Sequence, residues 1–354
     1  MGVYKALAEA KCHPSWVCGV SIGAVNGAII AGNAPDQRVA RLEEFWATIT
    51  ARNAAPFSPL ILSTALLGPW ATAASTWMTV MMGQPGFFSL HKVNFLQQPD
   101  AASATSFYDT SELRATLERL VDFDRLNNGE TRLSVGAVNI ATGNIIFSDT
   151  TKEWLGPEHI MASGALPPAL LMVKIDNAYY WDGGIVSNTP LQYMLDQDED
   201  VSALVFQVDL FSARGEIPQK MAQVTARQKD IVYSSRTRQA TTAFKRILSL
   251  RKPLAGALER MPANRRRAGE TELMHDYADA GVINLIELIY QSRPFENDTK
   301  DYEFSATSMR AHSQAGYADT IASMEHTEWF DLPSAEDGVV DHDVHRMAAK
   351  GSAR

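Results

Sequence analysis

The pentapeptide Gly19–Gly23, with the sequence G-V-S-I-G, has the clearest catalytic potential in the chain. An apolar stretch precedes the serine at residues 16–20, and a run of small and apolar residues follows it at 22–31. This context predicts a strand, a sharp turn and a helix, in which glycines on both sides make room for the turn and the Oγ of Ser21 is exposed. The N-terminus of that helix offers free N–H groups where negative charge develops, with the N–H of Ile22 as the candidate oxyanion donor. We therefore predict that Ser21 is a nucleophile; the alternative is a glycine-rich turn with a capping serine.

Asp182 is the candidate base for this serine. It ends a short apolar stretch, residues 178–181, and is followed by Gly183 and Gly184. The two glycines allow another backbone or a substrate to approach closely. A carboxylate in a poorly solvated site is more basic than one in water and can accept a serine proton. The alternative interpretation is that Asp-Gly-Gly forms only a turn.

A histidine base would give a different class of esterase. The order serine, acid, histidine of the α/β-hydrolases would have to use His275, His312 or His326. Each of these has the sequence surroundings of a helix-surface or tail residue. A Ser-His-Asp carboxylesterase is therefore the second enzymatic interpretation.

Strands and helices alternate through residue 210, which predicts an α/β fold with a mostly parallel central sheet and helices on both faces. The chain divides into a three-layer α/β domain over residues 1–210, a mainly helical and basic extension over 211–332, and a disordered tail over 333–354. The patterns predict strands at 16–20, 132–138, 145–147, 178–181, 204–209 and 282–290, and helices at 22–31, 38–48, 111–121, 159–163 and 305–324.

Composition limits the chemistry available to the chain. The 354 residues include only two cysteines, Cys12 and Cys18, so neither a disulfide framework nor a cysteine-rich zinc site is available. We expect no metal and no other cofactor. The N-terminus shows no apolar core after a basic start, so we predict no secretory signal and a cytoplasmic location. No oligomeric state is predicted.

Two segments indicate contact with a membrane surface. Residues 214–267 carry 14 Lys or Arg against three acids, although the whole chain has a net charge of -9. Residues 53–90 contain no Asp, Glu, Lys or Arg but include Trp70, Trp77 and several leucines and methionines. We expect peripheral contact with anionic lipid and not with nucleic acid. The alternative is that the basic segment is a solvated helical face and the apolar side chains complete the core.

The serine and aspartate blocks together resemble the patatin-like phospholipases. The matching segments are G-V-S-I-G-A-V-N-G-A at 19–28, A-S-G-A-L-P-P at 162–168 and D-G-G-I-V-S-N-T-P at 182–190. The resemblance covers about residues 1–210, and the remainder is similar to a C-terminal extension in a bacterial subgroup. It implies a patatin-like fold and hydrolysis of acyl esters in lipids without a metal. It also implies a Ser-Asp dyad, made here by Ser21 and Asp182, and an acyl-enzyme intermediate.

One feature of the family is missing from this sequence. The family has a first strand and a glycine-rich oxyanion loop upstream of a helix similar to residues 2–9, and here the chain begins at that helix. Losing one oxyanion donor typically lowers the rate by about 10²- to 10³-fold. We expect Met1 to be an internal residue of a longer protein. The alternative is a truncated, catalytically weak or silent protein that binds lipid or regulates.

Overall fold

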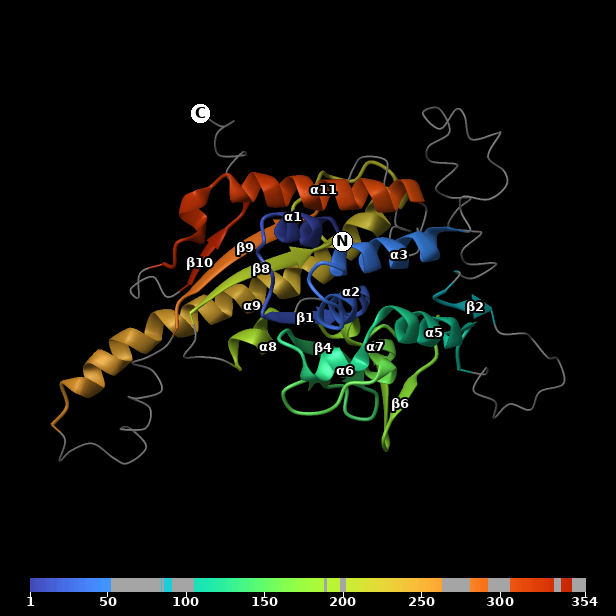
Figure 1. Cartoon of the computed structure of the whole chain (residues 1–354). Helices are drawn as coiled ribbons and strands as arrows, with labels where there is room; N and C mark the ends of the chain where they lie inside the picture. Colours follow the sequence, from blue (N-terminus) through green and yellow to red (C-terminus); the bar gives the residue numbers. More distant parts are fainter. Residues whose placement is uncertain are drawn as a thin grey trace.

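The computed structural model describes residues 1–51, 84, 86–90, 105–187, 190–197, 202–262, 281–291, 306–333 and 339–345. Helices surround a five-stranded sheet and a three-stranded sheet, and a two-stranded sheet pairs β2 (Ser89–Leu90) with β3 (Tyr108–Asp109) (Figure 1). The predicted α/β class is confirmed, with parallel pairing between two strands of the five-stranded sheet and throughout the three-stranded sheet. The helical C-terminal region is confirmed in part, because it contains long helices but also a strand at residues 283–289. Most of the uncharged segment 53–90, for which we predict lipid contact, lies outside the described residues.

The five-stranded sheet is organised around the buried strand β4 (Arg132–Asn139). β1 (Trp16–Val20) runs parallel to β4, whereas β5 (Ile145–Asp149) and β7 (Ala178–Asp182) run antiparallel to it. β6 (Val173–Ile175) pairs with β7 as a hairpin. The strands predicted at 132–138 and 145–147 are confirmed as the antiparallel pair β4 and β5.

The register shows that β1 and β7 meet end to end along one edge of β4. β5 pairs with residues 134–138 of β4, which overlaps the residues paired with β1 (132–136) and those paired with β7 (137–139). A strand has only two edges, so β5 occupies one of them and β1 and β7 share the other. Val20 lies opposite Gly136, and Asp182 lies opposite the next residue of β4, Ala137. The ends of β1 and β7 are thus brought together by consecutive residues of a third strand.

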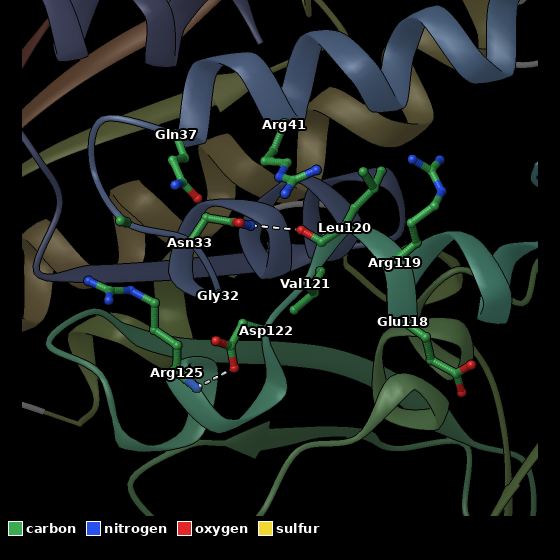
Figure 2. A pocket seen from close by; sticks show the side chains of 11 residues that line it. Gly32, Asn33, Gln37, Arg41, Glu118, Arg119, Leu120, Val121, Asp122 and Arg125 are labelled. Carbon is green, nitrogen blue, oxygen red and sulfur yellow. Dashed lines mark hydrogen bonds between the residues drawn. The ribbon is translucent and has the colours of Figure 1, made fainter.

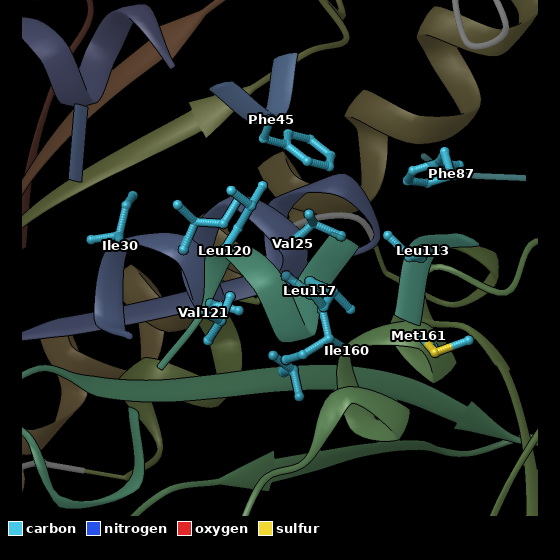
Figure 3. Close-up of a cluster of buried hydrophobic side chains, with 14 of the residues drawn as sticks. Val25, Ile30, Phe45, Phe87, Leu113, Leu117, Leu120, Val121, Ile160 and Met161 are labelled. Carbon is cyan, nitrogen blue, oxygen red and sulfur yellow. The ribbon is translucent and has the colours of Figure 1, made fainter. Parts of the chain in front are cut away.

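A helix of small residues packs closely on this sheet. In α2 (Ile22–Ala31), a Cβ at Gly27 would lie 3.0 Å from Leu133 and 3.1 Å from Val17, so glycine allows close contact between helix and sheet. Apolar side chains from four helices converge beside it, including Phe45, Leu117 and Ile160, and each is fully buried (Figure 3). Burying such a side chain contributes about 1.5–3 kcal/mol. The other helices around this core are α3 (Arg38–Thr50), α5 (Ser111–Leu120), α6 (Phe123–Asn128) and α7 (Pro157–Ser163).

A buried polar network lies on the opposite face of β4. Ser134 alternates with Leu133, which faces α2, so its side chain points away from that helix. The Asp149 carboxylate accepts hydrogen bonds from Ser134 Oγ at 2.5 Å, Arg132 Nε at 3.0 Å and Tyr193 OH at 3.0 Å. Burial alone would raise the pKa of Asp149, but the hydrogen bonds from Arg132 and Ser134 outweigh it and hold this pKa well below its usual value. The charged carboxylate therefore ties β4, β5 and Tyr193 together.

The C-terminal half adds a second, wholly parallel sheet, β10–β9–β8. Its strands are β8 (Ala203–Asp209), β9 (Ile283–Ile289) and β10 (Val339–His342), and its nearby helices are α8 (Leu191–Leu195) and the 39-residue α9 (Met221–Glu259). β10 corrects the prediction of a disordered tail over 333–354, because residues 339–345 are ordered beside β9. The reason is that Val339 and Val340 are β-branched residues, which favour a strand, and they pair with the edge of the apolar strand β9. The acidic residues around them in the tail obscure this short strand signal.

The two ends of the chain are joined by a helix pair. α1 (Gly2–Glu9) packs along α11 (Ala306–Met324), which precedes the short 3₁₀ helix η6 (Thr327–Phe330) (Figure 1). A Cβ at Gly2 would lie 1.8 Å from the carbonyl oxygen of Ser313, and Tyr317 donates a hydrogen bond to Glu9 at 2.6 Å. The absence of a side chain at Gly2 therefore sets the distance between α1 and α11.

We expect Gly2→Ala to destabilise the protein by about 1–3 kcal/mol, because the new methyl group overlaps a backbone carbonyl and forces the two helices apart. Thermal unfolding followed by circular dichroism measures this change. The matched control is Gly256→Ala, where a Cβ meets no atom within 4 Å and the substitution removes the low helix propensity of glycine. Equal melting temperatures for Gly2→Ala and wild type would contradict the importance of this contact.

Candidate active site

Ser21 occupies the sharp turn predicted between a strand and a helix. It has φ 57° and ψ −126°, a left-handed conformation that is strained for any residue except glycine, and it is the N-cap of α2. A Cβ at Gly19 would lie 2.4 Å from the carbonyl oxygen of Gly23, so the turn requires glycine there. At Gly23 the prediction is wrong, since a Cβ meets nothing within 4 Å. The steric restriction is therefore at residue 19, where a side chain would clash with the backbone of Gly23. A Cβ at residue 23 itself would meet no such obstacle.

The structure brings Asp182 directly to this serine. The Oγ of Ser21 donates a hydrogen bond of 2.6 Å to Oδ2 of Asp182. The other carboxylate oxygen, Oδ1, accepts a 2.7 Å hydrogen bond from the N–H of Gly184, and the side chain is buried. A Cβ at Gly183 would lie 2.5 Å from the carbonyl oxygen of Gly136, so the predicted close backbone approach is present. One carboxylate oxygen is thus fixed by the backbone of Gly184, and the other accepts the hydrogen bond from Ser21.

The environment of Asp182 makes it a stronger base than an ordinary aspartate. Burial raises its pKa to about 6, against the opposing effect of the hydrogen bonds from Ser21 and Gly184. At neutral pH the group remains a carboxylate, and its higher pKa increases its tendency to accept the proton of the serine. Geometry and electrostatics therefore fit the same pairing.

In the described structure, the first turn of α2 supplies backbone N–H groups that can stabilise negative charge beside Ser21. The carbonyl of Ser21 accepts from the N–H of Ala24 at 2.9 Å, which leaves the N–H groups of Ile22 and Gly23 in the first turn, ahead of the first helical hydrogen bond. These N–H groups and the helix dipole favour an oxyanion beside Ser21. In the described part of the chain β1 pairs only with β4, and no strand lies along its other edge.

The candidate histidines have other contacts. His312 on α11 packs edge to face against Tyr290, and His326 stacks on Trp329 and contacts Glu328 at 3.1 Å. His275 lies outside the described residues. The side-chain partner of the Ser21 hydroxyl in the described structure is a carboxylate and not an imidazole.

Sequence reasoning assigned no role to one residue of the site, Ser163. Its fully buried Oγ accepts a 3.0 Å hydrogen bond from the backbone N–H of Ser21 and donates one of 2.6 Å to the carbonyl of Gly136. The segment A-S-G-A-L-P-P at 162–168 is one of the blocks that carry the family resemblance, and its run of small residues is the sequence signal for a close approach here. The contact itself depends on how α7 ends over the sheet, which local sequence does not reveal.

A polar cavity of about 370 Å³ lies at the opposite end of α2 (Figure 2). Gly32 and Asn33 line it at the end of that helix, and two of its arginines, Arg41 and Arg119, are paired with Glu44. Its position and its internal ion pairs separate it from the chemistry at Ser21. The described residues contain no group of three or more His, Cys, Asp or Glu side chains arranged to hold a metal ion.

The chain matches known families over most of its length. A family model described as patatin-like phospholipase matches residues 1–195, and a second, described as patatin phospholipase, matches residues 231–336. No curated protein matches. The crystal structure of VipD from Legionella pneumophila is similar with a TM-score of 0.39 and 14% identity, over 99% of this chain and 71% of that one. Because the first model spans more than half of the sequence, the chain belongs to the patatin-like phospholipase family, a family of lipid acyl hydrolases.

Proposed function

We propose that the protein hydrolyses acyl ester bonds in lipids with a Ser21–Asp182 dyad. The observation that carries this proposal is the 2.6 Å hydrogen bond between the serine hydroxyl and a buried carboxylate. The strained conformation of Ser21 and the N-terminus of α2 support the same function, because nucleophilic serines of this type sit at strand-to-helix turns. Membership of the family supports a lipid ester as the substrate.

During acylation, Asp182 first accepts a proton from Ser21 and later donates it to the leaving alcohol. Oδ2 of Asp182 takes the hydroxyl proton as Oγ of Ser21 forms a bond to the ester carbonyl carbon. The negative charge that develops on the carbonyl oxygen is stabilised by the N–H groups at the start of α2. The bond to the leaving alcohol oxygen then breaks as Asp182 returns the proton to that oxygen. The alcohol portion of the lipid leaves, and the acyl group remains on Ser21.

Deacylation repeats the same steps with water. Asp182 takes a proton from a water molecule, whose oxygen attacks the acyl carbon. The bond between that carbon and Oγ breaks, and Asp182 returns the proton to Oγ. A fatty acid is released and the hydroxyl of Ser21 is restored.

Two other functions make different predictions. A Ser-His-Asp carboxylesterase would lose activity on substitution of one of three histidines, His275, His312 or His326. Of these, His312 and His326 have contacts elsewhere in the described structure. A catalytically silent lipid-binding protein would bind vesicles without ester hydrolysis or reaction at Ser21. The dyad proposal is therefore separated from both by activity measurements on single variants.

We expect Ser21→Ala to reduce hydrolysis of p-nitrophenyl esters to the background rate and to abolish labelling by a long-chain fluorophosphonate, because both reactions need the Oγ nucleophile. Activity and labelling are measured on the same preparation. The matched control is Ser323→Ala, at a buried serine on α11 whose hydroxyl donates a hydrogen bond to the carbonyl of Asp319 in the same helix. Undiminished hydrolysis in Ser21→Ala would disprove the nucleophile assignment.

Asp182→Asn should lower kcat by about 10²- to 10⁴-fold, since the amide keeps the shape of the carboxylate but cannot accept the proton. The base must be deprotonated to act, so the wild-type kcat/KM should fall as the pH drops below the raised pKa of about 6. The variant should lack this acid limb. His275→Ala, His312→Ala and His326→Ala should each keep near-wild-type rates, and loss of activity in any one of them comparable to that of Asp182→Asn would favour the carboxylesterase.

We also propose that the protein binds an anionic membrane surface through α9 and encounters its lipid substrate there. None of the described helices is long and apolar enough to cross a membrane. α9 extends beyond the sheet that it covers, and its outer half exposes Leu250 and Leu254 on one face (Figure 1). No acidic residue occurs at positions 231–258, which include six Lys or Arg, and one of these, Lys245, is ion-paired with Asp341 of β10. Apolar side chains with surrounding positive charge are typical of helices that lie on anionic lipid.

Replacing both leucines by serine should weaken vesicle binding by at least about 10-fold, because each buried leucine contributes about 1.5–3 kcal/mol. Co-sedimentation with anionic and neutral vesicles measures binding. Wild-type binding should require anionic lipid and decrease as salt screens the exposed charges. The control is Trp154→Ser, at an exposed aromatic residue of the N-terminal domain. Binding that ignores salt and lipid charge, or that survives the double substitution, would contradict this proposal.

A further inference from the structure

The segment at the end of α7, residues 163–165, contacts the backbone of both residues of the dyad. The Oγ of Ser163 accepts the N–H of Ser21 at 3.0 Å. Two residues later, the carbonyl of Ala165 accepts the N–H of Asp182 at 2.9 Å. Ser163 and Ala165 are both buried, so the two acceptor atoms lie in the protein interior.

The N–H of Ser21 needs such a partner because of its position. β1 ends at Val20, and the hydrogen bonds of α2 begin with the carbonyl of Ser21, so neither the strand nor the helix uses this N–H. The φ of 57° at Ser21 turns the chain that follows out of the line of the strand and into α2. A buried N–H without an acceptor is costly, so the hydroxyl of Ser163 stabilises the strained turn.

The direction of the hydrogen bonds at Ser163 is fixed by chemistry. The N–H of Ser21 can only donate and the carbonyl of Gly136 can only accept, so the hydroxyl must accept from the first and donate to the second. Gly136 is the residue of β4 that lies opposite Val20, and its carbonyl also restricts Gly183 beside the aspartate. One hydroxyl therefore links the nucleophile to the strand that sets the distance to the base.

We propose that Ser163 is a positioning residue of the acyl hydrolase, and that residues 163–165 form a clamp that holds Ser21 and Asp182 in hydrogen-bonding distance. This inference rests on the proposed dyad. Ser163 does not exchange protons with the substrate; it acts by holding the Ser21 backbone in its strained conformation. The hydrogen bond between the dyad residues is then maintained by the ends of β1, α7 and β7 together.

The test compares Ser163→Ala and Ser163→Cys with wild type and with Ser323→Ala, which removes an equally buried serine on α11. Ser163→Ala should lower kcat about 10- to 100-fold, the range expected from small displacements of a catalytic group. KM and the acid limb of the pH profile should stay unchanged, because substrate contacts and the base are intact. Ser163→Cys, which keeps the shape with a weaker hydrogen-bonding group, should be intermediate, and Ser323→Ala should keep the wild-type kcat.

Hydrogen–deuterium exchange provides a readout that does not depend on turnover. The peptide containing Ser21 should exchange faster in Ser163→Ala than in wild type and Ser323→Ala. If wild type neither hydrolyses esters nor reacts with a fluorophosphonate, the proposed function fails, whereas exchange still reports on the clamp. Wild-type kcat together with wild-type exchange in Ser163→Ala would overturn the proposal. If that variant does not fold, wild-type kcat and wild-type exchange in Ser163→Cys would overturn it.

Discussion

The short hydrogen bond between Ser21 and Asp182 requires two features that are each unfavourable in free energy, and the rest of the fold must offset both. Ser21 is held in a left-handed conformation, which costs about 1–3 kcal/mol for a residue that is not glycine. Asp182 keeps a carboxylate in a buried site, where desolvation raises its pKa to about 6. A flexible surface loop would relax both features. Their persistence requires rigid strands and helices on every side of the pair.

β4 is the element that meets this requirement. It pairs with β1 and β7 along a single edge, so the two strands that end at the dyad meet at the consecutive residues Gly136 and Ala137. On one face α2 packs closely through Gly27, and on the other the Asp149 network fixes β4 to β5. The site is therefore positioned by the centre of the sheet, and α11 of the C-terminal half packs against α1 and α3 of the N-terminal half.

Much of this arrangement could be predicted from the sequence, because the signals are local. The turn at Ser21 follows from glycine, an apolar strand and a small-residue helix, and the pairing with Asp182 follows from two motifs that occur together in one family. The end-to-end meeting of β1 and β7 could not be predicted, since it depends on which edge of β4 each strand occupies. Ser163 was missed for the same reason, because its role arises only where α7 ends against β4. The strand β10 was missed because acidic neighbours hid a short β-branched segment, and Gly23 was given a steric role that belongs to Gly19.

The assignment of Ser21 as the nucleophile is tested most directly by trapping the acyl-enzyme. The protein is mixed with a long-chain p-nitrophenyl ester, quenched with acid during turnover, digested and analysed by mass spectrometry. The dyad mechanism predicts one acyl group per chain, located on the peptide that contains Ser21 and absent from Ser21→Ala. An acyl group on a different residue, or continued hydrolysis with no acylated peptide, would contradict it.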